Sequence, residues 1–258
     1  MARAKRQRSA ASRFPIGRIV LKLIGAVIAL ILLYQAWLFG WVVWYNFFPP
    51  RQTAVMSQEL KRLRADEPDI RLRYQWVDYS AISPHLKRAV IAAEDARFLE
   101  HGGVDWEAIE KAFEHNRTLA AQMEKARQQG TRAPQRVMRG GSTLTQQVAK
   151  NLFLSNSRSY LRKGQELVIA YMLEAVMSKQ RILELYLNIA EMGEGVFGAE
   201  AAARHYFGAS AKTLSPHQAA RLAALLPNPR YYDKHRQSAY WNTRTQTLLR
   251  RMSASTIP

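Results

Sequence analysis

The sequence contains no cysteine and few acidic residues: 20 Asp and Glu stand against 38 Lys and Arg, for a formal net charge of +18. The lack of cysteine excludes disulfides, thiol nucleophiles and thiolate metal sites, but it leaves the compartment open, because an oxidising compartment permits disulfides without requiring them. Such a basic balance favours an anionic partner, such as nucleic acid, an acidic membrane surface or a phosphorylated substrate. Hydrophobic residues make up 48% of the chain, which excludes global disorder and predicts one good-sized domain with an appendage.

The N-terminal segment also lacks acidic residues, and the segment after it lacks any charge. Residues 1–22 contain seven basic residues and no acid, and residues 23–50 contain no charged residue. About 20 apolar residues span a bilayer as a helix, and four aromatic residues gather at the far end of this run, where amphipathic rings favour the headgroup layer: Trp37, Trp41, Trp44 and Tyr45. A cleaved signal peptide is the alternative, but it would have a shorter apolar region and small residues at its cleavage site.

We therefore expect a basic cytoplasmic tail over 1–22, a retained transmembrane helix over 23–48 and one external domain over 51–258. Basic residues stay on the cytoplasmic side, so the N-terminus should be inside and the domain outside. An external basic domain meets a membrane surface or a lipid phosphate rather than nucleic acid, which we exclude as a partner.

Helical patterns dominate the external domain. Ser83-Pro84 and Ser215-Pro216 each place a capping residue before a proline, which is typical of a helix start, and we expect the first of these helices to continue to Phe98. Further helical patterns cover 162–178 and 181–190, while strand signal is weak and limited to a short strand or hairpin in 70–79. Residues 115–139 are polar and basic without a clear apolar stripe, so we interpret them as a loop, either a surface connection or a substrate-contacting flap.

Two glutamates occupy apolar helical stripes. Glu94 shares a face with Leu86 and Val90, and Glu166 shares one with Ile169 and Leu173. A carboxylate on such a face is paired, protonated or turned into a cleft, because burying it alone is unfavourable. Desolvation raises a carboxyl pKa, which suits a general base near neutrality, although a helix-terminal salt bridge would explain Glu94 as well. Paired carboxylates are typical of glycosyl transfer.

Residues 139–151, RGGSTLTQQVAKN, combine a flexible glycine turn with the start of a helix. Main-chain N–H groups at such a start can bind an anion. On the helix that follows, Thr143, Gln147 and Lys150 fall on one stripe, and a hydroxyl, an amide and an ammonium together suit a phosphate or diphosphate. A solvated polar face is the alternative, and the segment is not a Walker A loop, because Lys does not follow the second Gly directly.

A basic cluster precedes Glu166. Arg158, Arg162 and Lys163 could hold a diphosphate leaving group, although Arg162 is also placed to pair with Glu166 four residues on. His101 follows Glu94 within EDARFLEHGG, and a lone histidine there is better interpreted as holding the glycine turn after it.

Together these motifs resemble those of the peptidoglycan glycosyltransferases found in bifunctional penicillin-binding proteins. Five motifs occur in the family's order: Glu94-Asp95 with Phe98, His101 and Gly103; Gly141-Ser142-Thr143 with Thr145-Gln146-Gln147 and Lys150-Asn151; Arg162-Lys163 with Glu166; Ile182-Leu183-Glu184 with Tyr186-Leu187-Asn188, Gly193, Gly195 and Gly198; and AARLAALLPNP. The chain most resembles the monofunctional biosynthetic transglycosylases, since it contains no Ser-x-x-Lys and we expect no transpeptidase. The 115–139 stretch is longer than the family pattern.

The resemblance implies a mainly helical, lysozyme-like domain with a small β element behind a single transmembrane helix, in the cell inner membrane with the catalytic domain periplasmic. It implies a growing glycan strand on polyprenyl diphosphate as donor, lipid II as acceptor and direct inverting displacement. By position, Glu94 is the general base, and Glu166 supports the leaving diphosphate, directly or through a divalent cation (Mg or Mn). Lys150 and Arg158 hold the diphosphate beside Thr143 and Gln147, with Arg162 and Lys163 in the same basic cluster, while Asp95 and His101 shape the site around Glu94.

Two alternatives stay open at this point. A lytic enzyme that cuts glycan strands would also need an acid in a cleft, but it needs neither the membrane helix nor the basic stripe. A catalytically silent scaffold for division or elongation would use the anchor and the helices to bind partners, but it needs none of Glu94, Lys150 and Glu166. On the glycosyltransferase interpretation, the membrane helix and the region 51–78 could also dock other cell-wall synthesis or division proteins.

Overall fold

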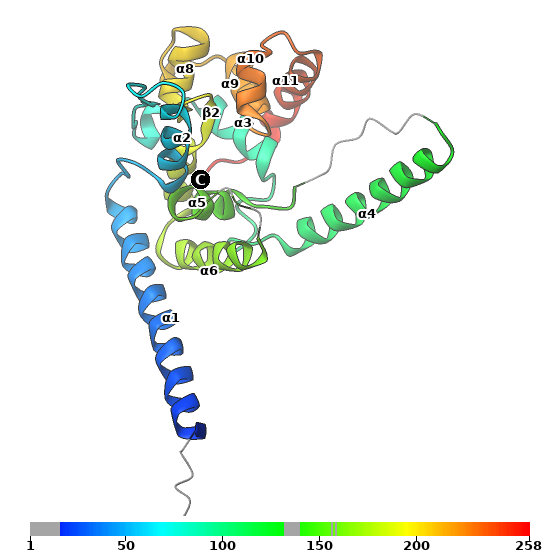
Figure 1. Ribbon diagram of the computed structural model, residues 1–258. Coiled ribbons are helices and arrows are strands. Elements are labelled where there is room, and N and C mark those ends of the chain that lie inside the picture. The colour runs from blue at the N-terminus through cyan, green and yellow to red at the C-terminus, as the bar shows by residue number, and fades with distance from the viewer. Residues whose placement is uncertain (1–15, 132–139, 156, 158) are drawn as a thin grey trace, which may run out of the picture. The chain divides into compact units, whose positions relative to one another are not determined.

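The long uncharged segment near the N-terminus forms one helix, α1 (Ile16–Phe47), in the computed structural model, which describes residues 16–131, 140–155, 157 and 159–258 (Figure 1). Gly17–Phe47 is long and apolar enough to cross a membrane, with a mean hydropathy of 2.3. At about 1.5 Å per residue the helix exceeds the ~30 Å hydrocarbon thickness. The helix begins before the transmembrane start expected at residue 23, because it already includes Arg18 and Lys22, and the membrane boundary itself stays a prediction.

The chain divides into two compact units, Met1–Trp41 and Val42–Pro258. The second unit is mainly helical, as expected, and two groups of helices form most of it (Figure 1). In the first group α5 packs on α2, α6 and α7: α2 (Ala54–Arg64), α5 (Leu144–Phe153), α6 (Tyr160–Val176) and α7 (Lys179–Ile189). In the second group α9 packs on α3 and α11: α3 (Pro84–Glu94), α9 (Pro216–Leu225) and α11 (Ala239–Arg251).

Capping residues fix where the important helices begin. The side chain of Ser83, which precedes Pro84, accepts a hydrogen bond from a main-chain N–H of α3. Ser215 forms a capping box with Gln218 at the start of α9. The sequence predicts both helix starts. The predicted continuation of α3 to Phe98 is wrong. The helix ends at Glu94, because Asp95 leaves helical geometry (φ −160°, ψ 75°) and accepts a hydrogen bond from the main chain of another helix.

The region 70–79 contributes a short strand and not a hairpin. β1 (Arg73–Tyr74) pairs in parallel with β3 (Val196–Phe197), which pairs antiparallel with β2 (Glu191–Gly193) in the order β1-β3-β2. This is the expected small β element. α8 (Ala199–Phe207) follows β3, and α10 (Pro229–Lys234) packs on β2.

The expected loop at 115–139 is wrong over its first part. α4 (Trp106–Gln128) is capped by Asp105 and continues to Gln128, and it ends before Gly130, whose φ is +62° (Figure 1). The segment is rich in Ala, Leu, Glu, Lys, Gln and Arg, which favour helix without requiring an apolar stripe. Residues 132–139 lie outside the described residues.

The core of the second unit lies between these helices. Its largest group is aliphatic and fully buried, and includes Leu86 and Val90 of α3, Leu144 and Val148 of α5, and Ile169 and Leu173 of α6. Each such side chain contributes roughly 1.5–3 kcal/mol through its removal from water. The stripes that carry Glu94 and Glu166 are therefore the core-facing stripes of their helices, as expected.

Candidate active site

Glu94 is the last residue of α3, and its side chain turns toward α5 and α11 instead of toward open solvent. The side chain is 14% exposed. Its Oε2 accepts a 2.9 Å hydrogen bond from Nε2 of Gln147 on α5, and its Oε1 lies 3.7 Å from a guanidinium nitrogen of Arg244 on α11. The carboxylate thus lies where the two helix groups meet, and it keeps a limited path to water.

The Gln147 amide is itself oriented by a neighbour. The hydroxyl of Tyr186 on α7 donates to Oε1 of Gln147 at 3.2 Å, so the amide nitrogen is turned toward Glu94. Tyr186 is buried, and burial raises the pKa of its hydroxyl well above the ordinary value, with Glu94 adding to the effect. A phenol that stays protonated is a permanent donor, so Gln147 is held in the one orientation that stabilises the Glu94 carboxylate.

Opposing effects act on the pKa of Glu94. Burial raises it above the ordinary value, and the hydrogen bond from Gln147 and the charges of Arg244 and Lys150 oppose that rise. Asp95 adds a smaller rise. Burial dominates, so Glu94 binds a proton more strongly than an exposed glutamate, which is the property that a general base acting near neutral pH requires.

Asp95, the residue after Glu94, joins three segments of chain. Its Oδ2 accepts a 2.9 Å hydrogen bond from the main-chain N–H of Leu144, the first residue of α5, and both of its oxygens lie 3.0 Å from Nε2 of His101. The anion at the start of α5 is therefore the protein's own carboxylate. Since Asp95 directly follows Glu94, this contact fixes the end of α3 against α5.

Thr143 is the N-cap of α5. Its hydroxyl donates to the Gly103 carbonyl at 2.6 Å and accepts from the main chain of Gln146, in a complete capping box. Gly103 has φ of +90°, and a Cβ there would meet Glu174 Cγ at 2.9 Å, so the close approach requires glycine. The Thr143 hydroxyl is engaged on both sides within the protein, and its contact with a ligand stays a prediction.

Lys150 lies on the last turn of α5 and is half-buried. Burial lowers the pKa of its ammonium, while Glu166, Glu191 and Glu94 oppose this by their charges. Both predicted catalytic glutamates are thus close enough to influence one ammonium. Within the described residues this ammonium donates no hydrogen bond to protein, so its donors can reach a ligand.

Glu166 on α6 is buried and paired within its own helix. Its Oε2 accepts a 2.6 Å hydrogen bond from Arg162, and its Oε1 accepts one from Lys163. Lys163 also donates to Oγ of Ser142 at 2.9 Å, which links α6 to the turn before α5. Burying a carboxylate becomes acceptable when both oxygens are paired in this way. Glu166 therefore holds two cations in place beside the glycine turn.

The arrangement limits how a divalent cation could bind at Glu166. Both of its oxygens already accept hydrogen bonds from basic side chains, and in the described part of the chain no three His, Asp or Glu side chains gather as a ligand set. Mg²⁺ often uses only one or two carboxylates and takes its other ligands from substrate phosphates and water. Any such ion would have to take most of its ligands from a bound substrate and from water.

A pocket of about 190 Å³ lies between the end of α3 and the turn before α5. Its lining includes Glu94, Arg97, Gly141 and Ser142. Arg97 donates to both carboxylate oxygens of Asp105, which closes one side of this pocket. The volume is below that of a typical ligand cavity.

The structure thus brings most of the predicted residues together. Gln147 and Lys150 lie with Glu94, while Arg162 and Lys163 lie with Glu166. Asp95 and His101 form the adjoining support, and Arg158 lies outside the described residues.

Sequence reasoning missed Arg244 and the role of Tyr186. Arg244 follows the last motif by fifteen positions in an unremarkable polar helix, and no local pattern distinguishes it from Arg250 on the same helix. Tyr186 lies within the fourth motif, where an aromatic residue is interpreted from sequence alone as part of the hydrophobic core. Only the packing of α7 and α11 against α5 and α3 reveals either contact.

Comparison with known proteins gives the family that this chain resembles. The family model described as Transglycosylase matches residues 65–253, which include all of these residues. The chain is 59% identical over 241 residues to a biosynthetic peptidoglycan transglycosylase of Bordetella pertussis, which covers 93% of this chain and 95% of the relative. It is 52% identical over 231 residues to the protein of that name from Herminiimonas arsenicoxydans (90% and 94% covered). With that of Laribacter hongkongensis it shares 50% over 235 residues (91% and 96% covered).

Proposed function

Because the chain belongs to the transglycosylase family, we propose that it polymerises peptidoglycan, transferring a growing glycan strand from polyprenyl diphosphate to lipid II with inversion at the anomeric carbon. The observation that carries the proposal is the half-buried Glu94 carboxylate with the Lys150 ammonium near it, which donates no hydrogen bond to protein within the described residues. A base and an anion-binding cation within one site are the two elements that this reaction needs.

In the proposed mechanism Glu94 takes the proton from the attacking sugar hydroxyl of lipid II. The hydroxyl oxygen then forms a bond to the anomeric carbon of the donor strand, and the bond from that carbon to the diphosphate oxygen breaks with its electron pair. Glu94 then loses its proton to water, to which its partial exposure gives access. Gln147, held by Tyr186, keeps the carboxylate oriented between turnovers.

The departing diphosphate gains negative charge, and we assign its stabilisation to the cations beside Glu166. Lys150 has donors free among the described residues, and Arg162 and Lys163 are held in place by Glu166. Each charge-assisted hydrogen bond contributes about 1.5–3 kcal/mol. Glu166 therefore acts by positioning these cations, and Arg158 is assigned to the same cluster by the family resemblance alone.

An exposed apolar stripe on α6 supports the proposal that the substrate is linked to a lipid. Tyr160 and Leu161 are 98% and 89% exposed, and Val168 and Tyr171 continue the same outer face at 41% and 47%. Such a contiguous apolar stripe beside basic side chains is typical of a surface that contacts a membrane. We assign it to the outer leaflet of the inner membrane, with α1 as a single-pass anchor and a cytoplasmic N-terminus.

The lytic alternative is less consistent with the site. Cleavage of glycan strands by water releases no diphosphate, so it provides no role for Lys150, Arg162 and Lys163 around a buried Glu166. The site around Glu94 and Glu166 is the one active centre that the proposed polymerase reaction requires.

Incubation of the detergent-solubilised full chain with labelled lipid II tests the proposal. We expect a ladder of glycan polymers together with release of polyprenyl diphosphate, and neither product from the Glu94→Gln variant. Absence of polymer from a protein with a cooperative thermal transition would contradict the polymerase assignment. Shortening of added glycan strands would instead support the lytic enzyme.

A further inference from the structure

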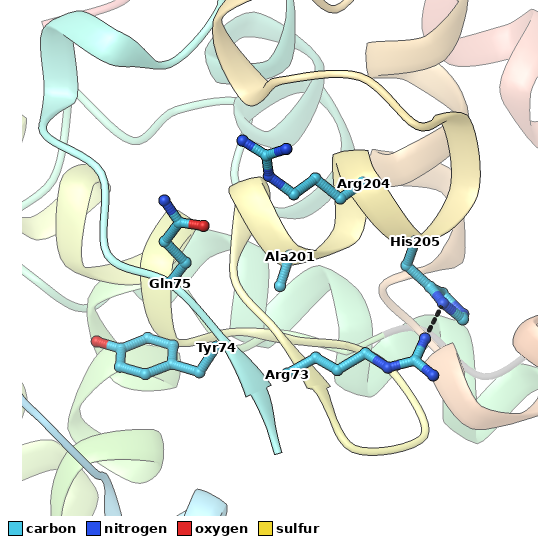
Figure 2. Close-up of a pocket in the computed structure, with 6 residues that line it drawn as sticks. All are labelled: Arg73, Tyr74, Gln75, Ala201, Arg204 and His205. Atoms are coloured by element: carbon cyan, nitrogen blue, oxygen red, sulfur yellow. Dashed lines mark hydrogen bonds between the residues drawn. The ribbon is translucent and has the colours of Figure 1, made fainter. Parts of the chain in front are cut away.

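A second pocket, of about 340 Å³, lies on elements that take no part in the site around Glu94. Its lining comes from the strand segment Arg73, Tyr74 and Gln75 and from Ala201, Arg204 and His205 of α8 (Figure 2). Figure 2 shows Ala201 in the middle of the pocket, between the arginine of the strand and the arginine of the helix. None of the residues around Glu94 lines this pocket.

Arg73 has no carboxylate partner within the described residues. One of its guanidinium nitrogens lies 2.6 Å from Nδ1 of His205, a contact that requires this nitrogen to accept and therefore to carry no proton. The opposite ring nitrogen, Nε2, lies 2.8 Å from Oδ1 of Asp233, to which it donates in this tautomer, and 2.9 Å from a guanidinium nitrogen of Arg236. A neutral imidazole thus holds Arg73 in place without cancelling its charge, and the other donors of its guanidinium remain available.

The second arginine of the pocket is only partly compensated. Arg204 lies 2.7 Å from Oε1 of Glu200, and its side chain is 61% exposed. Glu200 also accepts hydrogen bonds from Ser210 and from the main chain of Ala211, so its charge is shared among three donors. Arg204 can therefore bind an incoming anion without leaving Glu200 unsatisfied.

The local charge balance favours a singly charged anion. Arg204 pairs with Glu200 and Arg236 pairs with Asp233, whereas Arg73 contacts only the His205 ring, so the three guanidinium groups and two carboxylates leave one net positive charge. A carboxylate matches that charge, and the planar guanidinium fork suits its geometry. A doubly charged phosphate would be less well compensated.

The rest of the lining favours a peptide over a free ion. The methyl group of Ala201 offers apolar surface between the arginines, which suits the aliphatic part of an acidic side chain (Figure 2). β1 is also an edge strand of the three-stranded sheet in the described part of the chain. Edge strands are where extended peptides of other proteins bind, with alternate side chains entering adjoining pockets.

We propose that the pocket between β1 and α8 is a docking site for an extended acidic peptide segment of a partner protein, whose carboxylate binds Arg73 and Arg204. This site is separate from the reaction centre, so it can recruit a partner while polymerisation continues.

Fluorescence anisotropy with the detergent-solubilised full chain tests the proposal. The probe is a labelled short peptide of alternating Glu and Val, and its control is the same peptide with Gln in place of Glu. We expect Arg73→Gln and Arg204→Gln each to weaken binding of the Glu peptide by about tenfold or more, as the loss of a charge-assisted contact predicts. The matched control is Arg64→Gln, which removes the same charge from an exposed residue outside the pocket. It should change binding by less than about twofold.

Several results would overturn the proposal. Equal weakening by Arg64→Gln would reduce the effect to general charge, and equal binding of the Gln peptide would remove the carboxylate from recognition. Displacement of the peptide by inorganic phosphate at lower concentration than by acetate would favour a different anion. Binding of purified glycan stem peptides in preference to the acidic peptide would assign the pocket to the substrate. Arg73→Gln should polymerise lipid II at the normal rate, and a loss there, with an unchanged melting temperature, would place the pocket in the reaction.

Discussion

The side-chain amide of Gln147 donates a 2.9 Å hydrogen bond to Oε2 of Glu94 while accepting one from the buried hydroxyl of Tyr186. Three helices thereby meet at one carboxylate. α3 supplies Glu94, α5 supplies Gln147, which orients the Glu94 carboxylate, and α7 supplies Tyr186, which orients Gln147. Because burial and hydrogen bonding act on the Glu94 pKa in opposite directions, this contact sets how much of the base is ionised at a given pH.

Glu94→Gln should abolish polymerisation while leaving the fold intact. The amide keeps the shape of the side chain but cannot take a proton, so we expect the rate to fall by about 10²–10⁴. The rate of lipid II consumption and the melting temperature are the two measurements. Glu110→Gln, at an exposed position of α4, is the matched control and should behave as the unchanged protein. A normal rate for Glu94→Gln would remove Glu94 as the base.

Gln147→Ala should move the acid limb of the pH–rate profile to higher pH. The lost hydrogen bond stabilises the ionised carboxylate, so its removal raises the Glu94 pKa further, and a higher pH is then needed to ionise the base. The measurement is kcat/KM for lipid II against pH. Tyr186→Phe should shift the limb in the same direction by less, since it removes only the group that orients the amide. A shift to lower pH in either variant would contradict the arrangement.

Much of this site could be predicted from the sequence because its parts are local. The apolar stripe around Glu94, the capping signals at Ser83 and Ser215, and the glycine turn before α5 all lie within a few residues of the features that they define. A local pattern suffices in those cases, since helix periodicity alone decides which side chains face inward.

The contacts that sequence reasoning missed are long-range. Arg244 is far from Glu94 in sequence and reaches it only through the packing of α11 on α3 and α9. The end of α3 at Glu94 depends on the hydrogen bond between Asp95 and Leu144, which no propensity encodes. The error at α4 is of another kind, since polar helix formers extend a capped helix that has no apolar stripe.

Arg244→Gln should slow the reaction at neutral pH and recover part of the rate at higher pH. Its charge opposes the rise of the Glu94 pKa, so its loss leaves less of the base ionised. Comparison of kcat/KM at two pH values separates this effect from misfolding, which higher pH would not repair. Arg250→Gln removes an exposed charge from the same helix and should leave the profile unchanged. An equal loss at all pH values would assign Arg244 to substrate contact instead.

Glu166→Gln should reduce stability as well as activity. It leaves Arg162 and Lys163 without their carboxylate partner, and breaking a buried pair costs about 3–5 kcal/mol, less here because Lys163 is 37% exposed. We expect a lower urea midpoint of unfolding. At temperatures where the variant stays folded, we also expect a lower kcat/KM for lipid II. Glu114→Gln, on the exposed face of α4, is the control. A destabilised variant with normal kcat/KM would make Glu166 purely structural.

The apolar stripe on α6 should contact lipid when the full chain is placed in a bilayer. The chain has no native cysteine, so Val168→Cys gives a single attachment point for an environment-sensitive dye. Apolar burial stabilises by about 25 cal/mol per Å², so a stripe of exposed aromatic and aliphatic side chains should prefer the lipid surface. In nanodiscs we expect blue-shifted emission at residue 168 that lipid-borne quenchers reduce. Tyr240→Cys, at a position of similar exposure on α11, should report water. Identical emission from the two positions would mean that α6 does not face the bilayer, and the catalytic domain would then need another route to its lipid-linked substrate.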